Sequence, residues 1–359
     1  MPAALEQFKF LCSGSAVAED KPGKDAEAES AIGAGDAFAS LMQADAAWRR
    51  RRQAGRYRKG ETALTSGKAQ GHMTVNIFCI GDVVGKPGRG ILADHLHDYI
   101  RSNEIDLVVC NAENAAGGSG LTPQIFNKLL HYGVDVVTLG DHALRRREVF
   151  APLEESDRLI RPANLSGGAV GRGWTVVETK SGQARVGVTC LLGQMYMNSV
   201  PNSDSPWKTI DAVLDEMPSD VRIRVVDFHA EASSEKIAMG WHCNGRMSAV
   251  FGTHTHIPTA DARVLDGGTA YISDVGMTGP YDSVLGRRKD RVLQFLTTSM
   301  PAKFEVADGD VRISGLLASI DPETGRAISA EQVQICGRSE DADNANTDSQ
   351  PAQSRQTGD

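Results

Sequence analysis

The sequence predicts an α/β fold in which parallel strands alternate with helices and are followed by hairpins. Between residues 75 and 142, an apolar run, a polar loop and an amphipathic run follow one another repeatedly. Such a repeat indicates parallel strands joined by helical crossovers, whose loops gather at the carboxyl ends of the strands. After residue 174, turn pairs such as Ser181-Gly182 separate further apolar runs, which is typical of antiparallel hairpins.

The first repeat begins with a short apolar strand at residues 75–80. The segment 81–88 contains glycines and a proline, so we expect a turn there. Residues 89–103 have their apolar side chains at helical spacing, with Leu92 and Leu96 on one face. We therefore expect the helix to begin after the turn.

The second and third repeats follow the same plan. Residues 106–111 form the next expected strand. Thr122, as N-cap, and Pro123, in the first turn, open a helix that Gly133 ends. Residues 135–139 form the third expected strand.

The second half of the chain mixes helices with hairpins. Two hairpins are expected to pair 174–180 with 184–192 and 264–265 with 269–273, and a last one to pair 303–306 with 311–320. Helices are expected at 205–217 and 233–241, and strands at 221–229 and 247–253.

Composition predicts a globular protein with a substantial core. The chain has 359 residues, and 41% of them are hydrophobic. A formal net charge of −8 argues against nucleic-acid binding by bulk electrostatics, because that needs a clustered basic surface. The six cysteines have no CxxC spacing, so we expect reduced core residues. The sequence has no apolar run as long as the roughly 20 residues that span a bilayer. We therefore expect a cytoplasmic protein with no membrane partner.

The domain is expected at residues 73–336, between two dispensable ends. Residues 1–72 are rich in alanine, glycine and charge, and predict a disordered extension. Its basic run 49–59 could contact RNA or an anionic membrane, but a solvated tail, or a start upstream of a natural one at Met73, explains it more simply. Residues 337–359 predict a disordered tail.

Side chains of metal-ligand type stand at or just past the ends of the expected strands. In an extended backbone, residues two apart point the same way, so His254 and His256 would face one spot. The whole set suits Mn²⁺, Fe²⁺ or Zn²⁺ and is too large for one ion. It comprises Asp82, Glu113, Asn114, Asp141, His142, His229, His254 and His256.

Two ions bridged by a carboxylate are the economical interpretation of this set. A pair of ions about 3.5–4 Å apart can share a hydroxide, lower its pKa and clamp phosphoryl oxygens. Helix starts beside the same loops add backbone N–H donors for an anion. Phosphoester hydrolysis is the chemistry that this predicts.

Each candidate also has a simpler explanation. Asp82 could be only a helix N-cap, and Asn114 could only shape an Asx-turn. His229 could join Asp227 and Glu231 in a surface ion network. The remaining histidines are expected to be structural or solvated: His72, His95, His97, His131 and His242.

The chain resembles the bacterial YmdB-type metallophosphoesterases, which are relatives of the calcineurin-like phosphoesterases. The resemblance runs from about residue 75 to about residue 332. It implies a four-layer α/β sandwich of two mixed β-sheets flanked by helices, a dinuclear centre and 2′,3′-cyclic nucleotide phosphodiesterase activity. The segments that carry it, in order, are 81–85, 111–116, 140–142, 227–232, 252–256 and 274–282.

The resemblance also implies a role for each candidate. His142 resembles the family's proton donor to the leaving group. The cofactors implied are two divalent ions, iron or manganese, with zinc as an alternative. Each ion has three ligands of its own and one shared carboxylate: Asp82, Asn114 and His256 for one ion, Asp141, His229 and His254 for the other, and Glu113 between them.

One departure from the family pattern affects the site. Where the family has Gly-Asn-His-Thr-Trp-Asp, this chain has Gly-Asp-His-Ala-Leu-Arg at 140–145. Asp141 can ligate through the same oxygen as Asn, but it raises the ligand carboxylates from two to three. The lower net positive charge should weaken phosphate binding and raise the pKa of a bridging water, or favour an ion such as Fe³⁺. The arginines 145–147 could grip a substrate phosphate or be a solvated helix start.

The expected reaction is attack on phosphorus by a metal-bridging hydroxide, with His142 protonating the departing ribose oxygen. The expected substrate is a small phosphodiester or nucleotide. General phosphodiesterase or weak phosphomonoesterase activity is the runner-up. The alternative from another class is a catalytically weak, metal-dependent regulatory protein that binds a nucleotide or RNA, with turnover lost through Asp141; a redox role has less support. RNA ends stay open as partners, and the resemblance allows a homo-oligomer.

Overall fold

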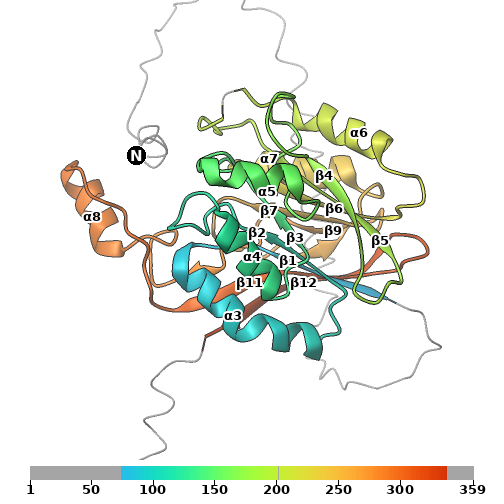
Figure 1. Ribbon diagram of the computed structural model, residues 1–359, viewed down its shortest axis with the longest axis horizontal. Helices are drawn as coiled ribbons and strands as arrows, with labels where there is room; N and C mark the ends of the chain where they lie inside the picture. The colour runs from blue at the N-terminus through green and yellow to red at the C-terminus, as the bar shows by residue number, and fades with distance from the viewer. Residues whose placement is uncertain (1–73, 201, 338–359) are drawn as a thin grey trace, which may run out of the picture. The chain divides into compact units, whose positions relative to one another are not determined.

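The computed structural model describes residues 74–200 and 202–337 (Figure 1). The expectations for the N-terminal extension, for its basic run 49–59 and for the tail from residue 338 onward lie outside the described residues. The domain boundaries therefore stay a prediction.

The first sheet combines a parallel centre with antiparallel strands at one side. Strands β1, β2 and β3 are parallel neighbours, and β11 pairs antiparallel with β1. The order is β10, β11, β1, β2, β3, with β12 also on β11. Its strands are β1 (Val75–Ile80), β2 (Leu107–Asn111), β3 (Val136–Thr138), β10 (Gly279–Pro280), β11 (Val311–Ile320) and β12 (Ala327–Cys336).

The second sheet is mixed as well. Strands β5, β6, β7 and β9 are parallel neighbours, while β4 and β8 pair antiparallel at the two edges. Both edge pairs are the hairpins that the sequence predicts. The strands are β4 (Trp174–Glu178), β5 (Arg185–Leu192), β6 (Ile223–His229), β7 (Ala249–Thr253), β8 (Arg263–Val264) and β9 (Ala270–Ile272).

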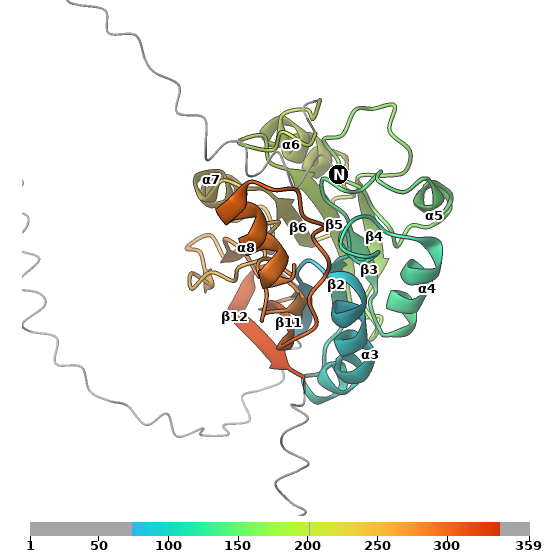
Figure 2. The same cartoon turned by 90° about the vertical axis from the view of Figure 1, so that its left-hand side faces the viewer.

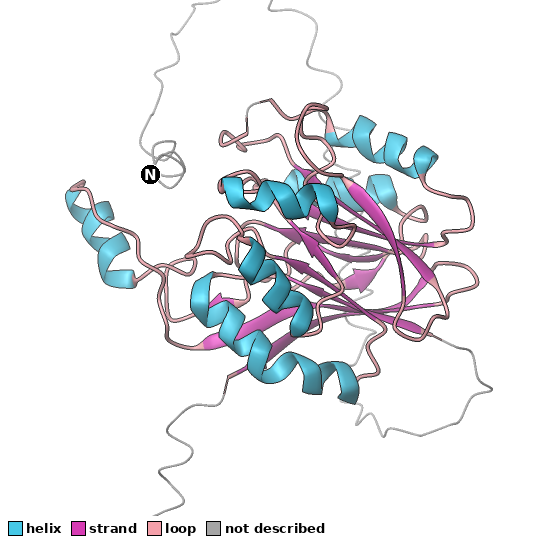
Figure 3. Cartoon of the chain, in the orientation of Figure 1, coloured by secondary structure: helices cyan, strands magenta, loops and turns pink. Residues whose placement is uncertain are grey.

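Helices cover the outer faces of both sheets (Figures 2 and 3). On the first sheet, α3 (Gly85–Ser102), α4 (Pro123–His131) and α5 (Phe150–Glu155) share one apolar cluster with the strands; a 3-10 turn, η1 (Arg147–Val149), leads into α5. On the second sheet, α6 (Pro206–Glu216) and α7 (Ser233–Cys243) share a separate apolar cluster with the strands. Helix α8 (Lys289–Thr298) stands away from the sheets at one side (Figure 1).

A third apolar cluster lies between the two sheets. It takes Ile77 and Leu107 from the first sheet, and Val188, Val225 and Phe251 from the second. Strands buried on both faces need almost continuous apolar sequence, which is why the predicted strands read as unbroken apolar runs. The helix, sheet, sheet, helix order confirms the predicted four-layer sandwich of two mixed sheets.

Helix α3 begins earlier than predicted. The segment 81–88, which we expected to be a turn, already contains the helical hydrogen bond from the N–H of Gly88 to the carbonyl of Val84 (3.1 Å). The proline at position 87 does not prevent this, because the N–H groups of a first turn have no intrahelical acceptor.

The last predicted hairpin is wrong. Strand β11 pairs along its length with β12, whereas Val306 makes only an isolated bridge to Arg287. The ten-residue strand β11 needs a partner of similar length, and residues 303–306 are too short to provide one. The sequence reasoning missed β12, and it also missed α8, in which only Val292 is buried.

The cysteines agree with the prediction, with one exception. Within the described residues all are free, and Cys79, Cys110, Cys190 and Cys243 are buried. Cys336 is exposed, because it ends the edge strand β12. None of the helices among the described residues is both long enough and apolar enough to cross a membrane.

Replacing Leu107 with alanine should lower the free energy of unfolding by about 2–5 kcal/mol, because it opens a cavity between the sheets. Leu293→Ala is the matched control, since Leu293 is 54% exposed on α8; we expect a change within about 0.5 kcal/mol. Urea unfolding followed by circular dichroism measures both. Equal losses in the two variants would contradict the position of this core.

Candidate metal centre

The candidate residues lie where strand ends of the two sheets meet. Residues after β1, β2 and β3 approach from the first sheet, and the last residue of β6 and the turn after β7 approach from the second. Hydrogen bonds and ion pairs connect all of the predicted side chains: Asp82, Glu113, Asn114, Asp141, His142, His229, His254 and His256. The predicted gathering of these residues is therefore present.

Glu113 lies at the centre of this cluster and is 1% exposed. Its Oε2 is 3.3 Å from Nε2 of His229. Its Oε1 is 3.1 Å from Nδ1 of His142 and accepts an amide N–H from Asn114 over 2.8 Å. His142 contacts both oxygens, but only Oε2 faces His229 and only Oε1 faces the Asn114 amide, which fits a carboxylate between two groups of candidate ligands.

On one side of Glu113, Asp141, His229 and His254 form a compact group. Asp141 Oδ1 is 3.1 Å from His229 Nε2, and His254 Nδ1 is 3.0 Å from the same nitrogen. One possible ligand atom from each of the three residues lies within 4.8 Å of the other two. Oxygen and nitrogen atoms that converge in this way can hold a metal ion.

On the other side, Asp82, Asn114 and His256 approach one another. Asn114 Nδ2 is 3.2 Å from His256 Nε2, and Asp82 Oδ1 is 3.9 Å from that same nitrogen. Asp82 Oδ2 accepts the backbone N–H of His254 over 3.0 Å. Asp82 Oδ1, by contrast, is buried and has no hydrogen-bond partner among the described residues. A buried carboxylate oxygen without a donor fits a cation as its partner.

The cluster carries more negative than fixed positive charge. Among the described residues, Asp82, Glu113 and Asp141 form ion pairs only with histidines, and none with lysine or arginine. Burial alone would raise the pKa of Asp141, but hydrogen bonds with His229 and His254 hold that pKa well below its ordinary value. Burial would lower the pKa of His229, but Glu113 and Asp141 raise it to about 9. These shifts show that the site favours positive charge.

The turn that carries His254 and His256 is not extended, contrary to the expectation. Their φ angles are 96° and 66°, values that residues other than glycine rarely adopt. The reason is that the turn is bonded at both ends, by the N–H of His254 to Asp82 and by the N–H of Met277 to the carbonyl of His256. The two rings therefore belong to the two different groups beside Glu113: His254 faces His229, and His256 faces Asn114.

Behind His229 lies a buried carboxylate, Asp227, so the alternative of a surface ion network around His229 does not hold. Asp227 accepts hydrogen bonds from Thr138, Thr253 and Asn111 at 2.5, 2.6 and 2.9 Å. Thr253 also lies 2.9 Å from His229 Nδ1. Burial raises the pKa of Asp227 to about 6. The sequence offered one sign that Asp227 is buried: it lies two residues before His229, on a strand that is buried on both faces.

Three arginines hold the loop of Glu113, residues 113–120. Arg146 donates to the carbonyls of Ala116 (3.0 Å) and Ser119 (3.2 Å). Arg287 donates to the carbonyl of Gly118, and Arg89 to that of Ala115. The sequence reasoning offered arginines 145–147 as a phosphate grip or a solvated helix start. Arg146 instead uses its guanidinium on this loop, while its two neighbours are exposed.

Two details fix Asp141 in place. A Cβ added at Gly140 would overlap with His229 and Glu113, so only glycine lets the backbone pass this close. Ser199 donates its hydroxyl to Asp141 Oδ2 over 2.7 Å, while Oδ1 faces His229. Asp141 is thereby held with one oxygen toward the centre.

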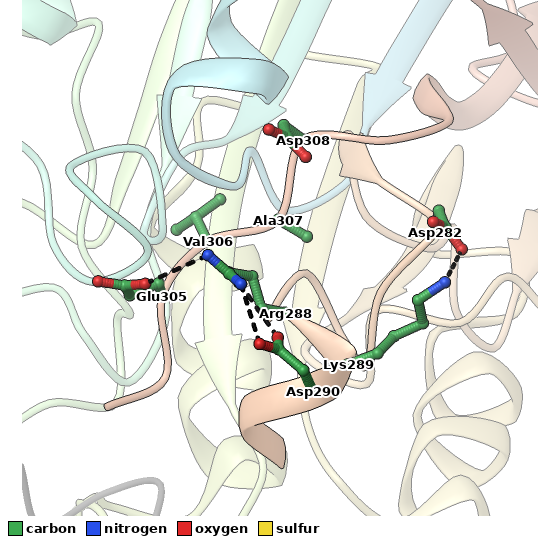
Figure 4. Close-up of a pocket in the computed structure, with 8 residues that line it drawn as sticks. All are labelled: Asp282, Arg288, Lys289, Asp290, Glu305, Val306, Ala307 and Asp308. Carbon is green, nitrogen blue, oxygen red and sulfur yellow. Dashed lines mark hydrogen bonds and ion pairs between the residues drawn. The ribbon is translucent and has the colours of Figure 1, made fainter. Parts of the chain in front are cut away.

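A separate hollow beside α8 has a different character (Figure 4). Most of its charged side chains are paired with each other: Arg288 with Asp290 and Glu305, and Lys289 with Asp282. It contains none of the candidate residues. We therefore place the chemistry at the strand ends.

The chain is similar to known proteins in sequence and in structure. The sequence model of the YmdB-like protein family matches residues 78–333. A 2′,3′-cyclic-nucleotide 2′-phosphodiesterase from Bacillus subtilis (strain 168) is 40% identical over 261 residues, which cover 73% of this chain and 97% of that protein.

Two solved structures are similar along most of their length. A hypothetical protein from Thermus thermophilus has 38% identity and a TM-score of 0.67, and the match covers 74% of this chain and 100% of that one. A phosphatase from Mycoplasma pneumoniae has 33% identity and a TM-score of 0.68, over 74% and 94% of the two chains. The chain therefore belongs to the YmdB-like protein family, and its two-sheet sandwich is a metallophosphoesterase fold.

Proposed function

We propose that this chain is an enzyme, a metal-dependent phosphoric diester hydrolase that acts on 2′,3′-cyclic nucleotides or related small phosphodiesters. The observation that carries the proposal is the convergence of two further carboxylates, Asp82 and Asp141, and of three histidines around the buried Glu113. The printed name of the Bacillus subtilis relative supports the substrate class. RNA ends as substrates, homo-oligomerisation and a cytoplasmic location stay predictions.

The proposed ligand roles follow the two sides of Glu113. When bound, two divalent ions, iron or manganese with zinc as an alternative, would activate water and offset the charge on the phosphoryl oxygens. Asn114 can ligate through its Oδ1 only if its amide turns, since Nδ2 faces His256 here. We assign Asp82, Asn114 and His256 to one ion, Asp141, His229 and His254 to the other, and Glu113 to both.

His142 is the proposed proton donor. Its Nδ1 is engaged with Glu113 (3.1 Å) and Asn114 (2.9 Å), and its Nε2 lies 3.8 Å from the nearest carboxylate oxygen, on Asp141. Its side chain is 18% exposed, more than any other histidine in the cluster. Nε2 can thus reach a substrate and protonate the departing ribose oxygen as the cyclic ester opens to a monoester.

Replacing His142 with alanine should lower kcat for 2′,3′-cyclic AMP by about 10²- to 10⁴-fold, the usual contribution of a positioned acid. Metal content should be unchanged, because His142 is not an assigned ligand. His131→Ala, at an exposed position on α4, is the control and should keep full activity. Full activity in the His142 variant, or loss of metal together with activity, would contradict the proposed role.

Asp141 favours the second candidate, a regulatory protein that binds metal and nucleotide but turns over slowly. A third carboxylate beside the proposed ions reduces the net positive charge that a phosphate meets. Ser199 can bond to either Asp or Asn at position 141, so the charge can be tested without changing the geometry. Bound metal and bound nucleotide without turnover of any phosphodiester would favour this candidate.

Asp141→Asn should leave metal stoichiometry unchanged and strengthen inhibition by inorganic phosphate by about five- to tenfold, because one negative charge is removed near the anion. Asp94→Asn makes the same change in net charge at an exposed position on α3 and should have no effect. Inhibition constants and metal analysis of the three proteins test this. Equal phosphate inhibition in all three would show that the extra charge does not affect the site.

A further inference from the structure

Lys236 and Asp274 form a salt bridge buried behind the turn of His254 and His256. Lys236 Nζ is 2.5 Å from Asp274 Oδ2, and the side chains are 3% and 1% exposed. Among the described residues, no other pair of a carboxylate with a lysine or arginine is buried to this degree. A buried salt bridge often adds no net stability over apolar side chains, so its presence points to control of conformation.

The Asp274 carboxylate is connected directly to the turn. Its Oδ2 accepts both the hydroxyl (2.7 Å) and the backbone N–H (3.2 Å) of Thr255. Its Oδ1 accepts the backbone N–H of Gly276 over 2.8 Å. Thr255 stands between His254 and His256, so one carboxylate holds the middle of the turn through side chain and backbone together.

Lys236 links this carboxylate to the scaffold. It lies on α7, outside the second sheet, and supplies the positive charge that balances Asp274. Its stem passes β7 at Gly252, where an added Cβ would touch the lysine stem and overlap with the carbonyl of Ser273. The turn is thus tied through Asp274 to a helix that contributes no candidate ligand.

We propose that Lys236, Asp274 and Thr255 are positioning residues that hold His254 and His256 in the conformation needed for metal binding. The inference rests on the proposed function, because it assigns both histidines as ligands. Since the two rings serve opposite sides of Glu113, loss of this unit should weaken both ion sites together. Loss of a single ligand would instead affect mainly one of them.

The test is Thr255→Val in the full chain, which keeps the shape and the branched Cβ but removes the hydroxyl donor. Mn²⁺ binding to metal-free protein is measured by titration calorimetry, together with thermal unfolding of the metal-free form. We expect both Mn²⁺ sites to bind about tenfold more weakly, as for other groups that orient metal ligands. Thr255→Ser restores the hydroxyl and should restore affinity.

Thr189→Val is the matched control. Thr189 is buried in β5 and donates its hydroxyl to the carbonyl of Gly173 over 2.9 Å. The Thr189→Val variant should lose about as much thermal stability as Thr255→Val, but it should keep the wild-type affinity for Mn²⁺. Wild-type affinity in Thr255→Val, or an equal loss of affinity in Thr189→Val, would overturn the positioning role alone. A wild-type chain that binds no Mn²⁺, Fe²⁺ or Zn²⁺ would overturn the proposed function and this inference with it.

Discussion

The buried carboxylates around Glu113 are the constraint on which the rest of the structure depends. Asp82, Glu113 and Asp141 are almost fully removed from water and face the same small group of histidines. Like charges buried this close repel one another, and each costs on the order of several kcal/mol unless a positive partner compensates it. Only a rigid backbone can hold them in place. The ends of strands that are buried on both faces provide such a rigid backbone, because each strand is hydrogen-bonded to its neighbours in the sheet.

Each segment of the site is also held from behind. The Glu113 loop is bonded to Arg89, Arg146 and Arg287, which come from α3, the segment before η1 and the segment before α8. His229 lies against Thr253, and the His254 turn is bonded to Asp274. These supports bind backbone carbonyls, N–H groups and hydroxyls. The oxygens and nitrogens of the candidate ligands therefore stay directed toward the centre.

Much of this could be predicted from sequence, and the limits have a physical cause. The strands were predictable because burial on both faces leaves continuous apolar runs, and ligand types at their ends indicated the centre. The hydrogen bonds of Arg287 with the Glu113 loop and those that bury Asp227 join residues far apart in the chain. The positive φ angles of His254 and His256 accompany such contacts, because the N–H of His254 is bonded to the distant Asp82.

The charge at position 141 shows how far such supports can compensate for a local change. Asp141 adds a carboxylate to a cluster that already favours positive charge, yet its geometry is defined, with one oxygen on Ser199 and the other toward His229. The arginines of the Glu113 loop donate to carbonyls, and in the described part of the chain none of the three forms an ion pair with a carboxylate. The fold can therefore keep a third carboxylate in position, and we expect the consequence of Asp141 to fall on how strongly an anionic substrate is bound.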